Sequence, residues 1–170
     1  MRIELENLGK SREFRSVLAA DELSLDDHDL RLIEPAEVSG RASRNGDEVK
    51  LGGRLRTRVE AACARCLKPV QFPIDIEFSE RFVPGVSWRS EEEHQLREED
   101  LDLAVLDGDA VDVGALVSEE ILLAMPSQVL CRQDCKGLCP TCGIDKNEKN
   151  CTCESRQVDS RWKALKNLRF

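Results

Sequence analysis

Hydrophobic and polar positions alternate with a period of two through much of residues 1–83, a pattern typical of half-buried β-strands. Ile3 and Leu5 begin this alternation in the segment RIELENL. The clearest strands are 51–61 and 70–82, where apolar and charged side chains alternate. We expect these two strands to form an antiparallel hairpin with CARCLKP as its turn. An earlier hairpin is predicted by Asn45-Gly46, a dipeptide favoured in tight β-turns.

The spacing of apolar residues becomes helical over residues 113–124. Asp112 is a favourable N-cap, and Pro126 cannot continue a helix. One face of this helix should cover the sheet; it carries Val113, Leu116, Val117, Ile121 and Ala124. A last helix is predicted at about 160–168, with Asp159 as its N-cap and an edge formed by Trp162, Leu165 and Leu168.

These elements predict an α+β fold with an antiparallel, β-rich N-terminal half packed by one or two helices and a small C-terminal zinc-knuckle segment. We expect four parts. Residues 1–83 form the β-rich part with the CxxC hairpin, and 84–110 form an acidic linker or flap. Residues 111–130 contain the helix that packs on the sheet, and 131–170 contain the cysteine-rich zinc segment and a basic C-terminal helix.

Charge is distributed unevenly along the chain, whose net charge is −8. Residues 89–112 contain ten acids and two bases, whereas 131–170 contain nine bases and five acids. Contact with a nucleic acid should therefore be local. The N-terminus lacks a signal-peptide pattern, and the longest apolar run, 121–125, is too short to span a membrane. We therefore expect a cytoplasmic protein without a membrane partner.

Cysteine is the residue type that most strongly indicates chemistry here. Six of the eight cysteines lie between residues 131 and 153, and the other two form the CARC of the hairpin turn. Clustered cysteines in a cytoplasmic protein bind metal or carry out redox chemistry more often than they form disulfides. CxxC pairs are a common source of zinc ligands. Two structural Cys₄ zinc sites are predicted: Cys63, Cys66, Cys131 and Cys135 in one, and Cys139, Cys142, Cys151 and Cys153 in the other.

Other interpretations of these cysteines remain open. A single zinc ion in the C-terminal segment would leave free thiols elsewhere. CPTC also resembles a thiol–disulfide redox motif, although such a motif should follow a strand and open a helix. A catalytic zinc site is disfavoured because His28 and His94 are the only histidines and neither belongs to an HExxH helix. We expect no enzymatic activity.

Basic side chains give a second set of candidate binding residues. Alternation places Arg54, Arg56 and Arg58 on one strand face, where they can contact phosphate. They can equally form cross-strand pairs, with Arg56 opposite Asp75 and Arg54 opposite Glu77. The full set of candidate RNA- or partner-binding residues is Arg54, Arg56, Arg58, Arg65, Lys68, Lys136, Arg161 and Lys163.

Several segments together resemble the YceD family of large ribosomal RNA subunit accumulation proteins. They are CARCLKP, EEILLAMP, CRQDCKGLCPTCG, CTC and DSRWKALKNL. The resemblance implies a bacterial or plastid protein that is needed for normal levels of large-subunit ribosomal RNA and has no established enzymatic activity. The chain departs from the family's usual CGxNLN pattern because Asp145 replaces an asparagine and Lys146 replaces a leucine.

Two binding hypotheses follow. In the first, the protein contacts large-subunit ribosomal RNA or a pre-ribosomal particle through its basic residues. In the second, it is an escort module that binds a ribosomal protein without touching RNA. The acidic segment favours the second, whereas the basic C-terminal region favours the first.

Overall fold

The computed structural model describes residues 1–25, 30–85, 103–106 and 108–153 of the chain. Two strands precede the long hairpins, β1 (Arg2–Glu4) and β2 (Ser11–Leu18), and short 3₁₀ turns η1 (Leu5–Asn7) and η2 (Ala20–Glu22) follow them. The hairpins consist of β3 (Leu30–Asn45), β4 (Glu48–Ala62) and β5 (Pro69–Pro84). The last described elements are β6 (Leu103–Leu106), β7 (Ala110–Asp112) and helix α2 (Val113–Ala124).

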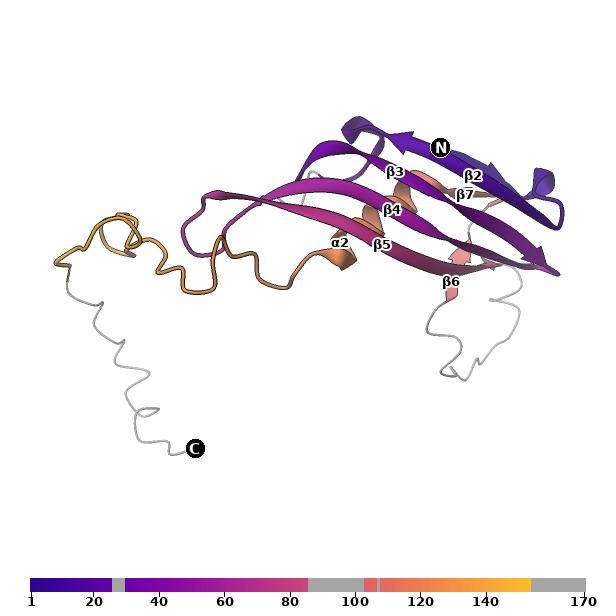
Figure 1. Cartoon of the computed structure of the whole chain (residues 1–170). Coiled ribbons are helices and arrows are strands. Elements are labelled where there is room, and N and C mark those ends of the chain that lie inside the picture. The colour runs from indigo at the N-terminus through magenta and orange to yellow at the C-terminus, as the bar shows by residue number, and fades with distance from the viewer. Residues whose placement is uncertain (26–29, 86–102, 107, 154–170) are drawn as a thin grey trace, which may run out of the picture.

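Five of these strands form one sheet in the order β2-β3-β4-β5-β6. All neighbours are antiparallel except β5 and β6, which are parallel. Strands β1 and β7 form a separate antiparallel pair. Figure 1 shows the long β4–β5 hairpin extending beyond α2 toward the cysteine-rich segment. The predicted α+β fold with an antiparallel, β-rich N-terminal half is confirmed.

Both predicted hairpins are present. The β3–β4 turn consists of Gly46 and Asp47, one residue later than the predicted dipeptide, and Gly46 has a φ of 62°. The β4–β5 pairing runs as far as Ala62 opposite Pro69, which leaves CARCLK as the turn. Its register also places Arg56 opposite Asp75 and Arg54 opposite Glu77, as predicted.

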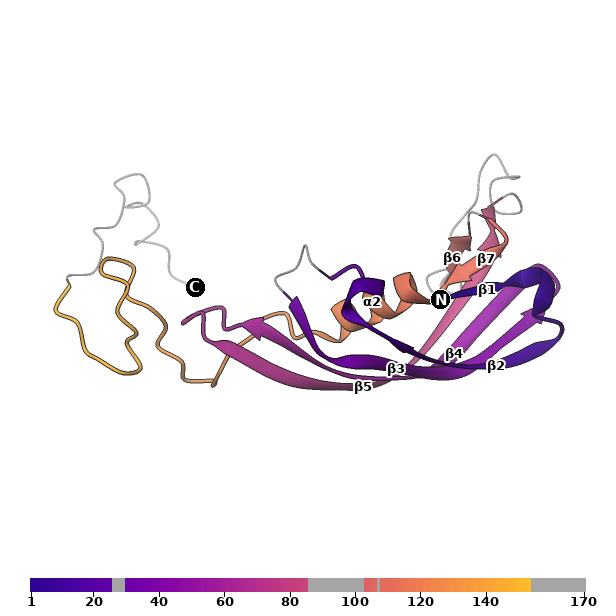
Figure 2. The same ribbon diagram turned by 90° about the horizontal axis from the view of Figure 1, so that it is seen from above.

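Helix α2 lies against the concave face of the curved sheet (Figure 2). Its N-terminus is fixed by Asp112, whose Oδ1 accepts a hydrogen bond from the backbone N–H of Gly114 at 2.9 Å. Four of the five predicted core residues of the helix are buried, whereas Ala124 at its C-terminal end is exposed. These side chains join the buried residues of β3 and β4 in one hydrophobic core.

A row of four cross-strand partners runs across the middle of the sheet, and its two central residues are glycines. Phe14 pairs with Gly40, Gly40 with Gly53, and Gly53 with Phe78. A Cβ on Gly40 would lie 2.8 Å from Gly53 Cα, so the two backbones approach too closely for any other residue. Both phenylalanines are buried beside this glycine pair and supply the apolar volume that the glycines lack.

The described end of the expected acidic linker at 84–110 contains strand residues. The apolar run Leu103–Leu106 forms β6 on the edge of β5, and Ala110–Asp112 forms β7, which pairs with β1. These pairings are non-local, so the acidic composition of the segment concealed them. The predicted strand RIELENL also ends early, at Glu4, where η1 begins. The helix predicted at 160–168 lies outside the described residues.

Candidate metal centres

The eight cysteines form two separate groups of four, with the membership expected from the sequence. Within each group the four Sγ atoms all lie within 4.8 Å of one another. We call the group at the end of the β4–β5 hairpin the tip site; it comprises Cys63, Cys66, Cys131 and Cys135. The second group is the loop site, which comprises Cys139, Cys142, Cys151 and Cys153. Each group is positioned to hold a metal ion.

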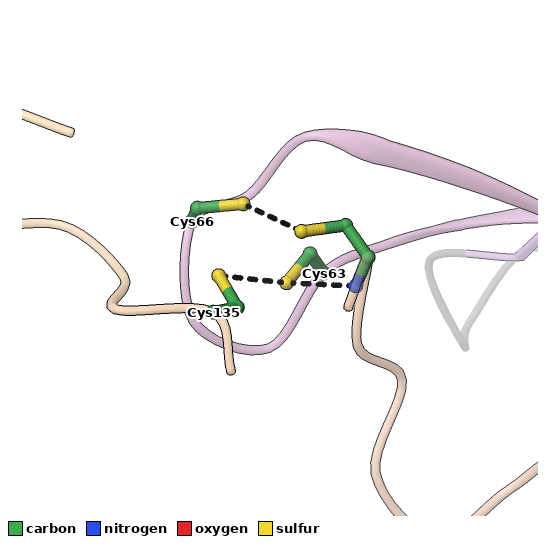
Figure 3. A group of neighbouring side chains, drawn as sticks. Cys63, Cys66 and Cys135 are labelled. Carbon is green, nitrogen blue, oxygen red and sulfur yellow. Dashed lines mark hydrogen bonds between the residues drawn. The ribbon is translucent and has the colours of Figure 1, made fainter. Parts of the chain in front are cut away.

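The tip site joins two segments that are far apart in the sequence. Cys63 and Cys66 lie in the hairpin turn, while Cys131 and Cys135 follow helix α2. The backbone N–H of Ala64 donates to the carbonyl of Val129 at 2.8 Å, which holds the second segment against the turn. In Figure 3 the sulfur atoms of Cys63, Cys66 and Cys135 point into a common space.

Sulfur spacing in the tip site fits a shared tetrahedral ion. Cys63 Sγ lies 3.9 Å from Cys135 Sγ, and Cys66 Sγ lies 3.6 Å from Cys131 Sγ. Zinc–sulfur bonds of about 2.3 Å in a tetrahedron place neighbouring sulfurs about 3.8 Å apart. A disulfide requires about 2.05 Å, and all eight cysteines are free thiols. The donor set therefore fits zinc.

The two CxxC turns share one hydrogen-bond pattern. In the tip site, Leu67 N–H donates to Cys63 O at 2.9 Å, and Cys63 N–H donates to Lys68 O at 2.8 Å. In the loop site, Gly143 N–H donates to Cys139 O at 2.9 Å, and Cys139 N–H donates to Ile144 O at 2.8 Å. Each turn thus directs its two sulfurs to the same side.

Hydrogen bonds to sulfur favour the thiolate form that a metal requires. Backbone N–H groups, that of Cys131 foremost, lower the pKa of the Cys63 thiol to about 6. The backbone N–H groups of Cys142 and Thr141 lower the pKa of Cys139 to about 6 in the same way. Burial, followed by the neighbouring thiols, raises the pKa of Cys131 to about 12. Hydrogen bonding thus favours the thiolate form of Cys63 and Cys139, whereas burial favours the thiol form of Cys131, whose ionisation a bound cation would promote.

The two sites differ in exposure. Cys63, Cys66 and Cys135 are buried at the tip site and pack with partly buried apolar side chains that include Leu130 and Leu138. In the loop site only Cys139 is buried, while Cys142 and Cys153 are exposed. We therefore expect the tip site to exchange metal more slowly than the loop site.

Arg65 connects the hairpin turn with the segment that joins the two sites. Its carbonyl accepts a hydrogen bond from Leu138 N–H at 3.0 Å, and its Nη1 donates to Cys135 O at 2.7 Å. Gly137 packs against it with a φ of 70°, and a Cβ there would lie 2.8 Å from Arg65 O. Gly137 O in turn accepts from Lys146 N–H at 3.0 Å. The tip site and the loop site are thus in direct contact through the backbone.

Lys68 forms a second connection between the sites. Its ammonium lies 2.9 Å from Asp145 Oδ2 and also contacts Glu148. Hydrogen bonding from Lys68 lowers the pKa of the Asp145 carboxyl, which keeps it charged. The aspartate that departs from the family's usual pattern therefore has a cationic partner in this chain.

Most of the predicted RNA-binding residues form ion pairs or hydrogen bonds with other residues of the same chain. Arg54 and Arg56 both bond Asp75, at 2.6 and 3.3 Å, and Arg58 bonds Glu34 at 3.0 Å. Arg65 and Lys68 hold the sites together as described above. Lys136 is exposed and has no ion-pair partner among the described residues. Arg161 and Lys163 lie outside the described residues.

Two residues of the site were not anticipated. Leu67 has a φ of 60° and is 65% exposed. Leucine does not favour this conformation, so the residue type does not predict it. The signal was its position after the second cysteine of the CxxC pair, where the other turn has Gly143. Asn147 Nδ2 donates to Cys135 Sγ at 3.4 Å. The signal for Asn147 was the final asparagine of the family's CGxNLN pattern.

The fold and the sites together define a small α+β protein in which helix α2 lies on a curved sheet and two four-cysteine groups are able to hold metal. The chain belongs to the YceD family: the family model described as "Large ribosomal RNA subunit accumulation protein YceD" matches residues 51–169. The resemblance inferred from the cysteine-rich segments is thereby confirmed.

Individual relatives extend this similarity. Protein YlbN of Bacillus subtilis is 31% identical over 94% of this chain and 88% of its own length. Rv2926c of Mycobacterium tuberculosis is 30% identical over 88% of this chain and 64% of its own length. The chloroplastic "Large ribosomal RNA subunit accumulation protein YCED homolog 1" of Zea mays is 26% identical over 73% of this chain, which spans half of that relative. No solved structure matches the chain.

No helix within the described ranges is both long enough and apolar enough to cross a membrane.

Proposed function

We propose that this protein is a non-catalytic zinc-binding factor that is needed for accumulation of large-subunit ribosomal RNA and that acts by binding. The observation that carries the proposal is the pair of four-thiol sites in a chain of the YceD family. Four protein ligands complete a tetrahedral zinc ion and leave no position for water or substrate. Zinc here would stabilise the fold and arrange the surface around the sites.

The tip site would give zinc a defined structural role. It fastens the end of the long β4–β5 hairpin to the segment that follows α2, in addition to the hydrogen bonds of Ala64 and Arg65 and the ion pairs of Lys68. Residues 131–153 contain no helix and only an isolated bridge between Leu138 and Asp145. Metal binding therefore supplies much of the energy that orders this segment.

The choice of partner is the finer part of the proposal. The exposed cations Lys136 and Lys149 lie near the two sites without ion-pair partners in the described part of the chain. They support contact with the phosphates of large-subunit ribosomal RNA or of a pre-ribosomal particle. The basic residues Arg161 and Lys163 of the C-terminal segment are further candidates.

A second candidate function is an escort module that binds a ribosomal protein without contacting RNA. It is favoured by the internal pairing of Arg54, Arg56, Arg58 and Lys68, which are four of the cations expected from the sequence to contact RNA. The redox hypothesis is a third candidate. The CPTC cysteines, Cys139 and Cys142, belong to a group of four whose sulfurs all lie within 4.8 Å of one another, which favours a shared ion over a redox pair.

The test combines elemental analysis with crosslinking in cells. We expect two zinc ions per chain in protein purified without added metal, and crosslinks to large-subunit ribosomal RNA. One ion would reject the two-site assignment, and none would reject the zinc function. RNA affinity should fall steeply with salt because phosphate contacts release counterions. Particle binding that is insensitive to salt would favour the escort module, and rapid thiol–disulfide exchange would favour redox activity.

A further inference from the structure

We propose that Asn147 couples the two cysteine sites, so that metal binding at the loop site increases the affinity of the tip site for metal. This inference rests on the proposed zinc function. It concerns a residue that belongs to neither set of ligands but touches one of them. It predicts that the protein fills its two sites cooperatively.

The Asn147 side chain uses both ends of its amide. Nδ2 donates to Cys135 Sγ at 3.4 Å and to Asp145 Oδ1 at 2.7 Å. Oδ1 accepts from the backbone N–H of Lys136 at 2.8 Å and from Arg132 Nη2 at 2.6 Å. These bonds hold the amide in one orientation, with its donor directed at a ligand of the tip site.

The position of Asn147 depends on the loop site. Asn147 lies in segment 143–150, between Cys142 and Cys151, and both of those cysteines belong to the loop site. An ion there would fix both ends of the segment. Without an ion, the four free cysteines of the loop site have no common partner to hold them together, so the two ends of the segment can move apart. Opening the loop site therefore withdraws the amide from Cys135.

The same segment reaches the tip site by a second route. Asp145 and Glu148 hold Lys68, and the carbonyl of Lys68 accepts the hydrogen bond from Cys63 N–H that shapes the first CxxC turn. Movement of segment 143–150 would thus disturb the tip site from both its hairpin side and its Cys135 side. The direct bond to sulfur makes Asn147 the closer of the two connections.

A hydrogen bond to a ligand orients it for the metal, and loss of such a partner typically lowers metal affinity about 10- to 100-fold. Coupling between two binding equilibria is reciprocal, so a filled tip site should also tighten the loop site. Cooperative loading would ensure that the cysteine-rich segment is either fully ordered or open.

A double-mutant cycle on the full chain tests the coupling. Its members are the wild type, Cys142→Ser/Cys153→Ser to remove the loop site, Asn147→Ala, and all three substitutions together. Zinc affinity of the tip site is measured by competition with a chromophoric chelator, and cobalt(II) absorption reports tetrahedral thiolate ligation. Asn150→Ala is the matched control, because Asn150 lies in the same segment, is exposed and makes no hydrogen bond to the described residues.

We expect loss of the loop site and Asn147→Ala each to weaken zinc binding at the tip site about 10- to 100-fold. The variant with all three substitutions should bind zinc at the tip site as tightly as whichever of the two parent variants binds it more weakly. Asn150→Ala should have the zinc affinity of the wild type. If the two fold-losses of zinc affinity multiply in the combined variant, the coupling is overturned. Unchanged zinc affinity of the tip site in either parent variant would also overturn it.

If Asn147→Ala does not fold, Asn147→Asp replaces it. An anion facing Cys135 should weaken zinc binding further, and unchanged affinity would overturn the proposal.

The outcomes separate this proposal from the function on which it rests. Two zinc ions that bind independently would overturn the coupling and leave the zinc function intact. A wild-type chain that binds no zinc would overturn both.

Discussion

Leu67 and Gly143 occupy the same position in two turns with the same hydrogen bonds, and their φ angles are 60° and 72°. Each follows the second cysteine of its CxxC pair. A positive φ is accessible to glycine at no steric cost but strains a residue with a Cβ. The two turns therefore place a leucine and a glycine in one backbone conformation, which allows the cost of the side chain to be measured in both directions.

Replacing Leu67 with glycine should not destabilise the fold. The substitution removes about 1–2 kcal/mol of left-handed strain and adds about 0.5–1 kcal/mol of chain entropy in the unfolded state. Because Leu67 is 65% exposed, little apolar burial is lost. We expect the free energy of unfolding to stay equal or to rise by up to about 1 kcal/mol.

The reverse substitution, Gly143→Leu, should lower the free energy of unfolding by about 1–2 kcal/mol. Chemical denaturation of the metal-loaded chains measures both variants, and elemental analysis checks that each retains its metal. A clear loss of stability in Leu67→Gly would mean that the leucine side chain supports the fold despite its exposure.

Gly137→Ala should loosen the connection between the two sites. The substitution strains a residue with a φ of 70° and places a Cβ 2.8 Å from Arg65 O, a backbone atom that cannot move alone. We expect faster hydrogen exchange at Leu138 and Lys146, whose N–H groups bond across this contact, and weaker metal binding at both sites.

Gly143→Ala is the control for this change. Its φ is also positive, but nothing lies within 4 Å of the new Cβ, so only backbone strain is added. If the two variants exchange hydrogen equally fast at Leu138, the close approach to Arg65 does not hold the sites together.

Local patterns in the sequence were enough to predict the main elements. Asp112 and Pro126 delimit helix α2, and alternation about the CARC turn gave the β4–β5 register, including Arg56 opposite Asp75. The cysteines could be divided because four of them lie close enough in sequence to form a site unaided, which leaves the other four to pair across the chain.

The remaining features depend on contacts between distant segments. Strand β6 is identified only by its pairing with β5, and its acidic neighbours suggested a linker instead. The sequence also did not indicate the connections between the loop site and the tip site through Arg65, Lys68 and Asn147. Arginine, lysine and asparagine are common on protein surfaces, so residue type alone does not indicate these roles. Each role depends on the neighbour that the fold places beside the residue.

The glycine pair in the sheet should be intolerant of any side chain. Gly40→Ala places a Cβ 2.8 Å from Gly53 Cα and closer still to Gly52 O, so β3 and β4 must separate. We expect the free energy of unfolding to fall by at least about 2 kcal/mol, in the upper part of the range for overpacked sites. Gly52→Ala is the neighbouring control, since its Cβ would make an ordinary contact of 3.6 Å with Phe78 O. Similar melting temperatures for the two variants would contradict the close approach.

Charge reversal at Lys136 and Lys149 should distinguish RNA contact from protein escort. Reversing Arg65 or Lys68 would be ambiguous, because Arg65 bonds Cys135 O and Lys68 holds Asp145. Lys136 and Lys149 are exposed and have no side-chain partner among the described residues, so their reversal leaves the described contacts intact. If each contacts one phosphate, Lys136→Glu/Lys149→Glu should reduce the slope of log affinity against log salt by about 2 for large-subunit ribosomal RNA.

Lys10→Glu/Lys50→Glu is a control of equal charge change, since both residues are exposed and lie at the far end of the sheet. Zinc content and thermal stability should match the wild type in both double variants. In cells that lack the native copy, only the Lys136/Lys149 variant should fail to restore large-subunit ribosomal RNA. If this variant fully restores large-subunit ribosomal RNA and its RNA affinity has an unchanged salt dependence, these lysines do not belong to the RNA-binding surface. Binding through paired charges and apolar groups to a ribosomal protein would then be the better supported function.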